Sequence, residues 1–263
     1  MNLSKILGPL FYNLDKKRKK VVFTNLDLVF PDKSEEEKEK LAKEIYENFA
    51  FNLFEILKNR NITKEELQKK VEIVGLEKVK PYLDKPAVFI TAHYGNWEMM
   101  PLVLGGLLGI PMTIVVREID NKFINKFFKK SRERFNIKTV NKKGALKKLI
   151  QAVKNNRSVG ILVDQNTAKN EGIDVEMFGL KALHTPSAAL LAKKFDIPII
   201  PVFIQRDGDK YKVIFKDPIL EKDIKKSVQK QSDVIEEMIR QKPKEWYWFH
   251  RRFKHYYEDR YET

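Results

Sequence analysis

The stretch from Phe89 to Glu98 (FITAHYGNWE) constrains the fold most, because an apolar segment ends there in a histidine. The run Ala87–Thr91 has the length and character of a buried strand. α/β proteins place their chemistry at the carboxyl ends of such strands. On one continuous helix His93 and Glu98 would diverge, because positions i and i+5 lie about 140° apart. Gly95 permits a sharp strand-to-helix turn that would return Glu98 to His93, as a general base with its orienting carboxylate or as a structural pair.

Composition indicates one globular unit without thiol chemistry. The chain has 263 residues, of which 43% are hydrophobic, so it can bury a sizeable core. Cysteine is absent, which excludes disulfides, thiolate catalysis and cysteine zinc sites. There are four histidines and no HExxH pattern, so we expect neither a metal nor a cofactor. We see no secretory signal pattern and expect a cytoplasmic protein.

The formal net charge of +15 and the pI of about 9.6 call for an acidic partner. Nucleic acid, anionic lipid and an acidic carrier protein all qualify, because a basic surface steers each of them over long range. Charge therefore identifies a category of partner and leaves its members open.

The first seventy residues predict helices. Apolar residues recur at helical spacing near the start: Leu3, Ile6, Leu7, Leu10, Phe11 and Leu14. The basic cluster DKKRKK follows at residues 15–20, and this combination suits an anionic membrane surface, although the same stripe would also dock on the protein's own core. Ser34 with Glu37, and Thr63 with Glu66, have capping-box spacing. We therefore expect an N-terminal amphipathic and helical segment, residues 1–70, packed on an α/β domain, residues 71–263.

The uncharged stretch Met99–Val116 has eighteen residues, the lower limit for crossing a bilayer. Glycines and prolines interrupt it at Pro101, Gly105, Gly106, Gly109 and Pro111. We therefore favour a helix over Trp97–Leu108 and a buried strand over Met112–Val116, with a membrane span as the minor alternative.

Three predicted strands end in a side chain that can do chemistry. His93 follows the first strand, Arg117 follows Met112–Val116, and Asp164 follows 159–163. Arg117 can point into a site formed by His93, and Asp164 is placed in the same way, although a solvated loop aspartate is the alternative. The helix after Arg117 carries Arg132 and Arg134, either as a solvated basic face or as a ligand site. The whole pattern predicts a central mixed, mostly parallel sheet flanked by helices.

Aromatic and basic residues alternate near the C-terminus, in WYWFHRRFKHYY at residues 246–257. This pattern suits stacking on single-stranded nucleic acid, and it also suits a membrane interface. A terminal helix with buried aromatic residues is the third interpretation.

Several blocks, in order along residues 18–254, resemble the bacterial lipid A late acyltransferases, the lauroyl and myristoyl transferases. The blocks are NLDLVFP at residues 25–31, the His-x4-Glu motif from His93 to Glu98, Arg117, Asp164-Gln165 with Phe178-Gly179 and Ala192, and Glu245-Trp246 followed by Arg251-Arg252-Phe253. The resemblance implies a glycerolipid-acyltransferase-like domain that moves a fatty acyl chain from acyl carrier protein to a hydroxyl, or an acyl-chain hydroxyl, of a lipid A precursor. It implies the cytoplasmic face of the bacterial inner membrane. That family usually begins with a membrane-spanning segment, so we expect peripheral or monotopic attachment here through the first helix, the basic cluster and the aromatic C-terminus.

The resemblance also implies roles for individual residues. His93 would be the general base and Glu98 would orient its imidazole, without a protein nucleophile. The tetrahedral oxyanion would be held by backbone N–H groups of Gly95 and Asn96 or by Arg117, and Asp164 would organise Arg117 or the acceptor. The candidates for binding phosphate are Arg132, Arg134, Arg251 and Arg252. Acyl-acyl carrier protein is the expected donor, with acyl-CoA as the alternative, and no cofactor is implied.

Other functions stay open at this point. The acceptor could be another anionic glycolipid or a phospholipid, since transferases that acylate mannosylated phosphatidylinositol share the motif. A hydrolase would use water in place of the acceptor. A basic nucleic-acid-binding protein would explain the charge, but it gives no reason for His93 and Glu98, and its binding would weaken steeply with salt.

Overall fold

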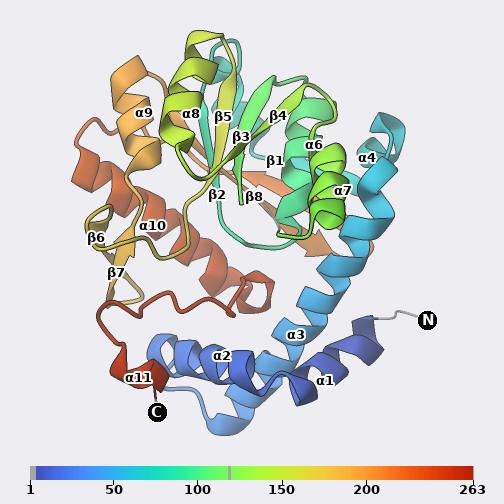
Figure 1. Ribbon diagram of the computed structural model, residues 1–263, viewed down its shortest axis with the longest axis vertical. Helices are drawn as coiled ribbons and strands as arrows, with labels where there is room; N and C mark the ends of the chain where they lie inside the picture. The colour runs from blue at the N-terminus through green and yellow to red at the C-terminus, as the bar shows by residue number, and fades with distance from the viewer. Residues whose placement is uncertain (1–3, 118–119, 263) are drawn as a thin grey trace.

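The computed structural model describes residues 4–117 and 120–262 (Figure 1). Four helices precede the first strand: α1 (Ser4–Leu14), α2 (Lys16–Val29), α3 (Glu35–Lys58) and α4 (Lys64–Lys70). Both predicted capping boxes are confirmed, because Ser34 with Glu37 begins α3 and Thr63 with Glu66 begins α4. Asp15 accepts from the N–H of Arg18 at the start of α2.

A seven-stranded sheet forms the centre of the molecule, in the order β1-β9-β8-β2-β5-β3-β4. Five strands run parallel: β2 (Val88–Thr91), β3 (Met112–Val116), β4 (Ile137–Asn141), β5 (Ser158–Leu162) and β8 (Ile199–Asp207). Strand β9 (Lys210–Phe215) is antiparallel to β8 and parallel to β1 (Val71–Val74). A separate hairpin joins β6 (Ile173–Met177) to β7 (Leu180–His184). The predicted mixed, mostly parallel sheet is confirmed.

Helices cover both faces of this sheet (Figure 1). Alternate residues of β2 belong to two different hydrophobic cores, one on each face of the sheet. Val88 and Ile90 lie in one core and Phe89 lies in the other. The first core is covered by α8 (Ala145–Lys154), α9 (Ser187–Phe195) and α10 (Ile224–Gln241). The second is covered by α4, α5 (Leu76–Val79) and α6 (Met100–Gly106), near α7 (Lys122–Arg132). The short helices are η1 (Asn59–Asn61), η2 (Lys80–Tyr82), η3 (Trp97–Met99), η4 (Pro243–Glu245) and α11 (Asp259–Glu262).

Helices α1, α2 and α11, from the two terminal parts of the chain, form a layer beneath the sheet (Figure 1). Buried Asn25 of α2 joins this layer to the C-terminal segment, because its Nδ2 donates to the carbonyls of Trp248 (2.7 Å) and His250 (2.9 Å). Trp246, Trp248 and Phe253 are at most 3% exposed, in an irregular segment. Of the three interpretations, the terminal helix is therefore wrong for this segment, although the burial that it implied is right, and these three rings are closed to nucleic acid.

The uncharged stretch is part of the globular fold. Residues 97–116 form η3, α6 and β3, so the predicted helix is shorter and begins with a 3-10 turn. Within residues 4–117 and 120–262, no helix is both long and apolar enough to span a bilayer.

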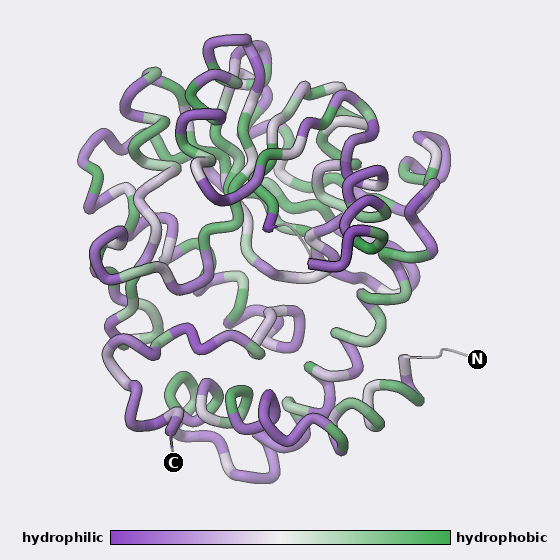
Figure 2. The backbone as a smooth tube through the Cα atoms, in the orientation of Figure 1, coloured by the Kyte–Doolittle hydropathy of each residue, from purple (hydrophilic) through white to green (hydrophobic). Residues whose placement is uncertain are grey.

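The predicted apolar stripe of α1 is only partly covered by the rest of the protein. Its first residue, Leu3, lies outside the described residues. The helix buries Ser4, Gly8 and Tyr12. Its apolar residues at the molecular margin stay exposed: Ile6 by 49%, Leu10 by 47% and Leu14 by 71% (Figure 2). The helix therefore packs on the protein with one face and leaves an apolar face uncovered.

Candidate active site

His93 and Asp164 meet at the carboxyl ends of neighbouring strands. Thr91 of β2 pairs with Leu162 of β5, and each chemical side chain lies two residues farther on. Nδ1 of His93 is 2.8 Å from Oδ1 of Asp164, and the N–H of His93 donates to Oδ2 at 3.0 Å. Asp164 is 2% exposed, whereas the His93 side chain is 20% exposed. The aspartate is therefore buried behind an imidazole that remains accessible.

The Asp164 carboxylate is held ionised. Burial alone would raise its pKa, but the charge of His93 and hydrogen bonds from His93 and from Trp246 Nε1 (2.8 Å) hold the pKa well below its usual range. An ionised carboxylate only accepts hydrogen bonds, so Nδ1 of His93 carries the ring proton. The lone pair of Nε2 is then available as a base.

Three side chains surround the imidazole. Trp97 packs edge-on against it, with ring centroids 5.2 Å apart, and the Tyr247 ring lies at 6.0 Å. The N–H of Tyr247 donates to the His93 carbonyl at 2.9 Å. Nε2 of Gln165 lies 3.3 Å from Nε2 of His93, so its amide can donate to the basic nitrogen.

Gly95 makes the turn after His93 possible. Its φ of +57° is unfavourable for other residues, and an added Cβ would lie 1.7 Å from the Ile204 carbonyl oxygen. Its N–H donates to the Glu245 carbonyl at 2.9 Å, and its carbonyl accepts from Asn52 Nδ2 at 2.9 Å. The turn is thus held from the C-terminal segment and from α3.

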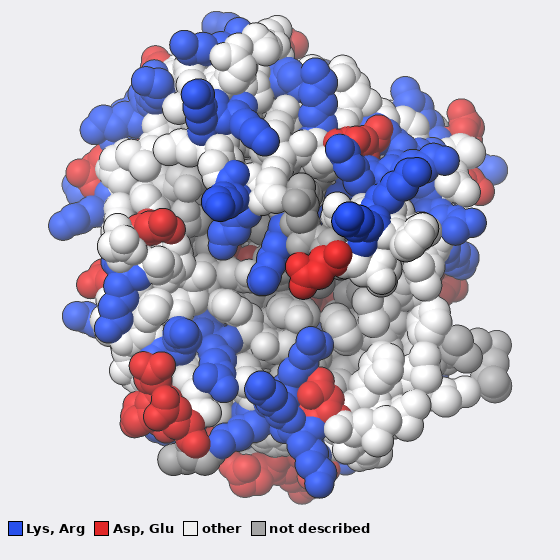
Figure 3. Space-filling view, in the orientation of Figure 1, with Lys and Arg blue, Asp and Glu red and all other residues white. Residues whose placement is uncertain are grey.

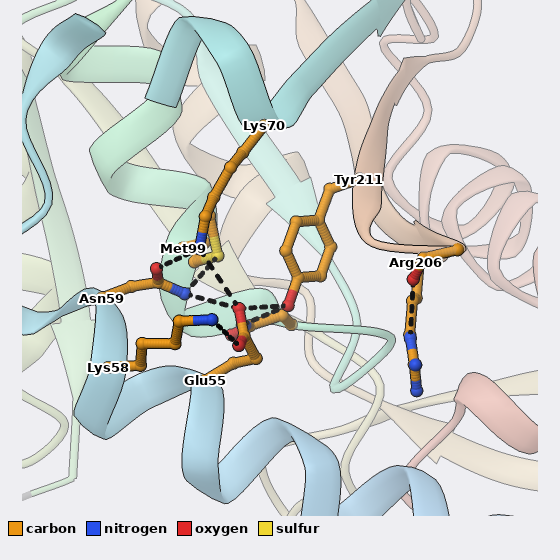
Figure 4. A network of polar contacts seen from close by, with 9 residues as sticks. Glu55, Lys58, Asn59, Lys70, Met99, Arg206 and Tyr211 are labelled. Atoms are coloured by element: carbon orange, nitrogen blue, oxygen red, sulfur yellow. Dashed lines mark hydrogen bonds and ion pairs between the residues drawn. The ribbon is translucent and has the colours of Figure 1, made fainter. Parts of the chain in front are cut away.

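A network of polar contacts around Glu55 supports the turn through Asn96 (Figure 4). Buried Glu55 accepts from Asn59 Nδ2 at 2.9 Å and from the Tyr211 hydroxyl at 3.1 Å. Lys70 Nζ lies 3.6 Å from Glu55, and Asn96 reaches the Tyr211 hydroxyl at 3.4 Å. Burial opposes ionisation of Glu55, but hydrogen bonds from Asn59 and Tyr211 and the charge of Lys70 keep its pKa below the usual value.

Glu98 forms a two-pronged ion pair with Arg132. Nε and Nη2 of Arg132 lie 2.7 and 2.6 Å from the two carboxylate oxygens. The side chains are 19% and 13% exposed, so the pair is partly shielded from solvent. All 11 residues of α7 are exposed or half-buried. The ion pair therefore joins this helix to the segment just after the His93 turn.

A cavity of about 760 Å³ opens at His93. Its polar wall contains His93, Glu98, Arg132, Arg117 and Gln165, and much of the rest is apolar. The described residues contain no cluster of three or more His, Asp or Glu that could hold a metal. The cavity can therefore accept a long apolar group whose polar end lies at the base.

Sequence comparison places the chain among known proteins. A family model described as bacterial lipid A biosynthesis acyltransferase matches residues 1–255. The chain belongs to this family. It is therefore an O-acyltransferase.

Similar relatives of this acyltransferase span nearly its whole length. The lipid A biosynthesis lauroyltransferase of Escherichia coli is 26% identical and aligns over 94% of this chain and 83% of the relative. A lipid A biosynthesis acyltransferase of Haemophilus influenzae is 23% identical, over 89% and 74%. The lipid A biosynthesis myristoyltransferase of E. coli is 22% identical, over 92% and 77%. The resemblance seen in the motif order is confirmed.

Within this acyltransferase, several expected side-chain arrangements differ from those observed. The prediction that Glu98 orients His93 is wrong, because Asp164 occupies that place and Glu98 binds Arg132. Asp164 therefore does not organise Arg117, which is exposed at the cavity. The N–H of Gly95 is already bonded to Glu245, so it is not a free oxyanion donor.

Four other residues predicted to belong to the site do not line the cavity. Asn96, predicted to donate its backbone N–H to the oxyanion, is 1% exposed and is not among the residues that line the cavity, and its side chain points toward Tyr211. Arg134 binds the carbonyls of Arg60 and Ile62, and Arg251 lies 6.0 Å from the Tyr261 ring centroid. Arg252 is 1% exposed and donates to the Leu183 carbonyl, so the prediction that it binds phosphate is wrong. Only Arg117 and Arg132 of the predicted arginines are among the described residues that line the cavity.

The sequence assigns no individual role to four residues that shape the site. Trp246 donates a hydrogen bond to Asp164, Tyr247 and Gln165 flank the imidazole, and Asn52 holds the turn. Gln165 and Trp246 belong to the blocks that resemble the family, but those blocks do not indicate what either side chain contacts. Asn52 lies on a helix 43 residues before Gly95, and no local pattern connects them.

Proposed function

We propose that this acyltransferase moves a fatty acyl chain from an acyl carrier protein thioester to a hydroxyl of a lipid A precursor, with His93 as general base and Asp164 as its orienting carboxylate. The observation that carries the mechanism is the contact between His93 Nδ1 and Asp164 beside a large, mostly apolar cavity. The family and the names of the relatives support the acceptor.

The proposed reaction needs one base and no protein nucleophile. Nε2 of His93 removes the proton from the acceptor hydroxyl as its oxygen attacks the thioester carbonyl. The tetrahedral intermediate collapses, the carbon–sulfur bond breaks, and the imidazolium returns the proton to the leaving thiolate. Asp164 remains ionised and stabilises the imidazolium.

The proposed hydrogen-bond donors for the oxyanion are side chains that line the cavity, not the backbone N–H groups of the turn. The Gln165 amide lies beside the base, and Arg117, the residue that follows β3, lines the same cavity. Either group can donate to an oxygen that becomes negative during attack. Lys142 and Arg117 also line the opening, which favours phosphate on the acceptor.

The surface charge supports anionic partners. Lys and Arg side chains surround a hollow at the centre of the face shown in Figure 3. This distribution attracts both an acidic carrier protein and a phosphorylated acceptor.

Mass spectrometry of the acceptor tests the reaction most simply. The wild-type protein is incubated with acyl carrier protein thioesters and a lipid A precursor, and the expected product is heavier by one acyl group. A free fatty acid formed without acylated acceptor would indicate a hydrolase instead. Acyl transfer only to a phospholipid or another glycolipid would contradict the proposed acceptor while retaining the reaction.

We also propose that the protein works at the surface of an anionic membrane, the cytoplasmic face of the inner membrane. Exposed apolar residues on three helices, named here the apolar rim, are Ile6, Leu10, Leu14, Leu53, Leu57, Phe123 and Ile124. Arg60, just after α3, lies 5.7 Å from the Phe127 ring centroid of α7, so these helices are neighbours. Exposed lysines of α2 and α7 lie beside the rim, as interfacial binding requires.

Vesicle sedimentation tests this attachment. The protein should bind vesicles rich in phosphatidylglycerol more tightly than neutral ones, and salt should weaken the binding. Leu10→Ser with Leu14→Ser should reduce binding, whereas Leu220→Ser, at a 54% exposed leucine outside the rim, should not. Equal losses in both variants would contradict the rim as the docking surface.

A further inference from the structure

Gly160 occupies the middle of the sheet, but part of its surface is open. It lies in β5 between two neighbours, opposite Phe89 of β2 and Ile114 of β3. Phe89 is 2% and Ile114 9% exposed, whereas Gly160 is half-buried and lines the cavity. Glycine inside a strand often marks a place where a ligand approaches the backbone closely.

The surroundings of Gly160 form an apolar pocket on one face of the sheet. Residues directly opposite one another in a sheet share a face, so Gly160 faces the same side as Phe89 and Ile114. Helix α6 covers that side. The apolar side chains that line the cavity there are Phe89, Met100, Leu104, Met112, Ile114 and Val202.

The pocket runs away from the base along the strands. His93 lies four residues beyond Phe89, which corresponds to roughly 13 Å at about 3.3 Å per residue. An extended hydrocarbon advances roughly 1.3 Å per carbon, given bonds of about 1.5 Å. A chain whose carbonyl lies at His93 would therefore bring about its tenth carbon to the level of Gly160.

We propose that Gly160, together with Met112 and Leu104, closes the acyl pocket and sets the length of the chain that is transferred. This inference rests on the proposed acyl transfer. A Cβ on Gly160 would lie 2.9 Å from Cγ2 of Ile114 and 3.2 Å from Cε of Met112. An added methyl group therefore takes up space at the closed end, and the end of the Met112 side chain must move into the pocket or away from it.

A competition assay tests the proposal. One reaction contains acyl carrier protein thioesters of C8 to C16, and the masses of the products report the preference. Gly160→Ala should lower the ratio of the wild type's preferred chain to the chain two carbons shorter by roughly tenfold or more, since one methylene in an apolar pocket discriminates by that factor. Leu104→Ala should shift the preference toward longer chains, and it keeps the test valid if Gly160→Ala does not fold.

Val103→Ala is the matched control, because Val103 is fully buried in the same helix and core but is not among the residues that line the cavity. It should weaken the fold and leave the chain preference unchanged. If the folded variants at positions 104 and 160 keep the wild-type preference, or if Val103→Ala shifts it equally, the assignment of the closed end is wrong and acyl transfer stands. A wild-type protein that transfers no chain would overturn both the proposed function and this inference.

Discussion

His93 and Asp164 stand opposite each other because the register between β2 and β5 continues for two residues beyond the pair Thr91–Leu162. The resulting contact joins His93 Nδ1 and Asp164 Oδ1 at 2.8 Å, across 71 residues of sequence. Oδ2 of the same carboxylate accepts from the His93 and Trp246 N–H groups. The sheet itself therefore fixes the tautomer and the direction of the imidazole.

Asp164→Asn should reduce kcat by about 10³- to 10⁴-fold. An asparagine can present its NH₂ group to Nδ1, which would move the ring proton to Nε2 and remove the base. Steady-state acyl transfer and a thermal melt would measure the two effects. A folded variant with more than a tenth of wild-type kcat would contradict the role of Asp164.

Glu98→Gln should loosen α7 without disturbing the imidazole of His93. The substitution removes the charge that holds Arg132 and leaves the His93–Asp164 contact intact. Hydrogen exchange of α7 amides should quicken, and kcat should fall by about 10- to 100-fold as the cavity wall is misplaced. In a double-mutant cycle with Arg132→Gln, the coupling should exceed about 1 kcal/mol. A loss of kcat as large as that of Asp164→Asn, with unchanged exchange of the α7 amides, would instead connect Glu98 to the imidazole.

Asn52→Ala should lower kcat more than KM. The variant leaves the Gly95 carbonyl without its donor from α3, at a cost of about 1–3 kcal/mol, and allows the catalytic turn to move. Asn48→Ala is the control, because Asn48 lies one helical turn earlier and donates to the Lys244 carbonyl. Both variants should lose similar stability, but only Asn52→Ala should lose about tenfold in kcat. Equal kcat values would show that Asn52 serves stability alone.

The free energy of unfolding should decrease as pH falls from about 6.5 toward 4. Burial lowers the pKa of His184 to about 3 and that of His250 to about 4, whereas an unfolded histidine titrates near 6.5. Between these values the unfolded chain binds more protons, so stability is complete above about 6.5 and is lost below it. Each histidine contributes a slope of up to about 1.4 kcal/mol per pH unit.

Urea unfolding at several pH values measures that slope. His250→Gln retains an acceptor for the N–H of Asn166, which His250 binds at 2.9 Å, and removes one titrating group. The slope of the unfolding free energy against pH, between about pH 6.5 and 4, should then shrink to roughly half. An unchanged slope would mean that His250 does not contribute.

Local sequence patterns were sufficient to predict the strands and the polar residues that follow them. The apolar runs before His93, Arg117 and Asp164 became β2, β3 and β5, and the order of the motifs indicated the family. The order of strands in the sheet was not readable, because it depends on how the helices pack. Glu98, five residues from His93, was therefore chosen as its partner in place of Asp164.

Burial of the C-terminal aromatic residues could not be predicted either. Alternating aromatic and basic residues occur at interfaces and in cores alike, and only tertiary contacts separate the two cases. Here Asn25 of α2 binds the Trp248 carbonyl and buries the segment, whereas Tyr247 reaches the active site. Similarly, Arg252 has the charge of a phosphate ligand but lies buried against Leu183.

The most direct test of the mechanism is acyl transfer from acyl carrier protein thioester to a lipid A precursor by wild type and His93→Ala under identical conditions. A general base contributes about 10²- to 10⁴-fold, so the folded variant should lose at least a hundredfold in kcat while still binding the thioester. A folded His93→Ala protein that transfers the acyl chain at nearly the wild-type rate would contradict His93 as the base.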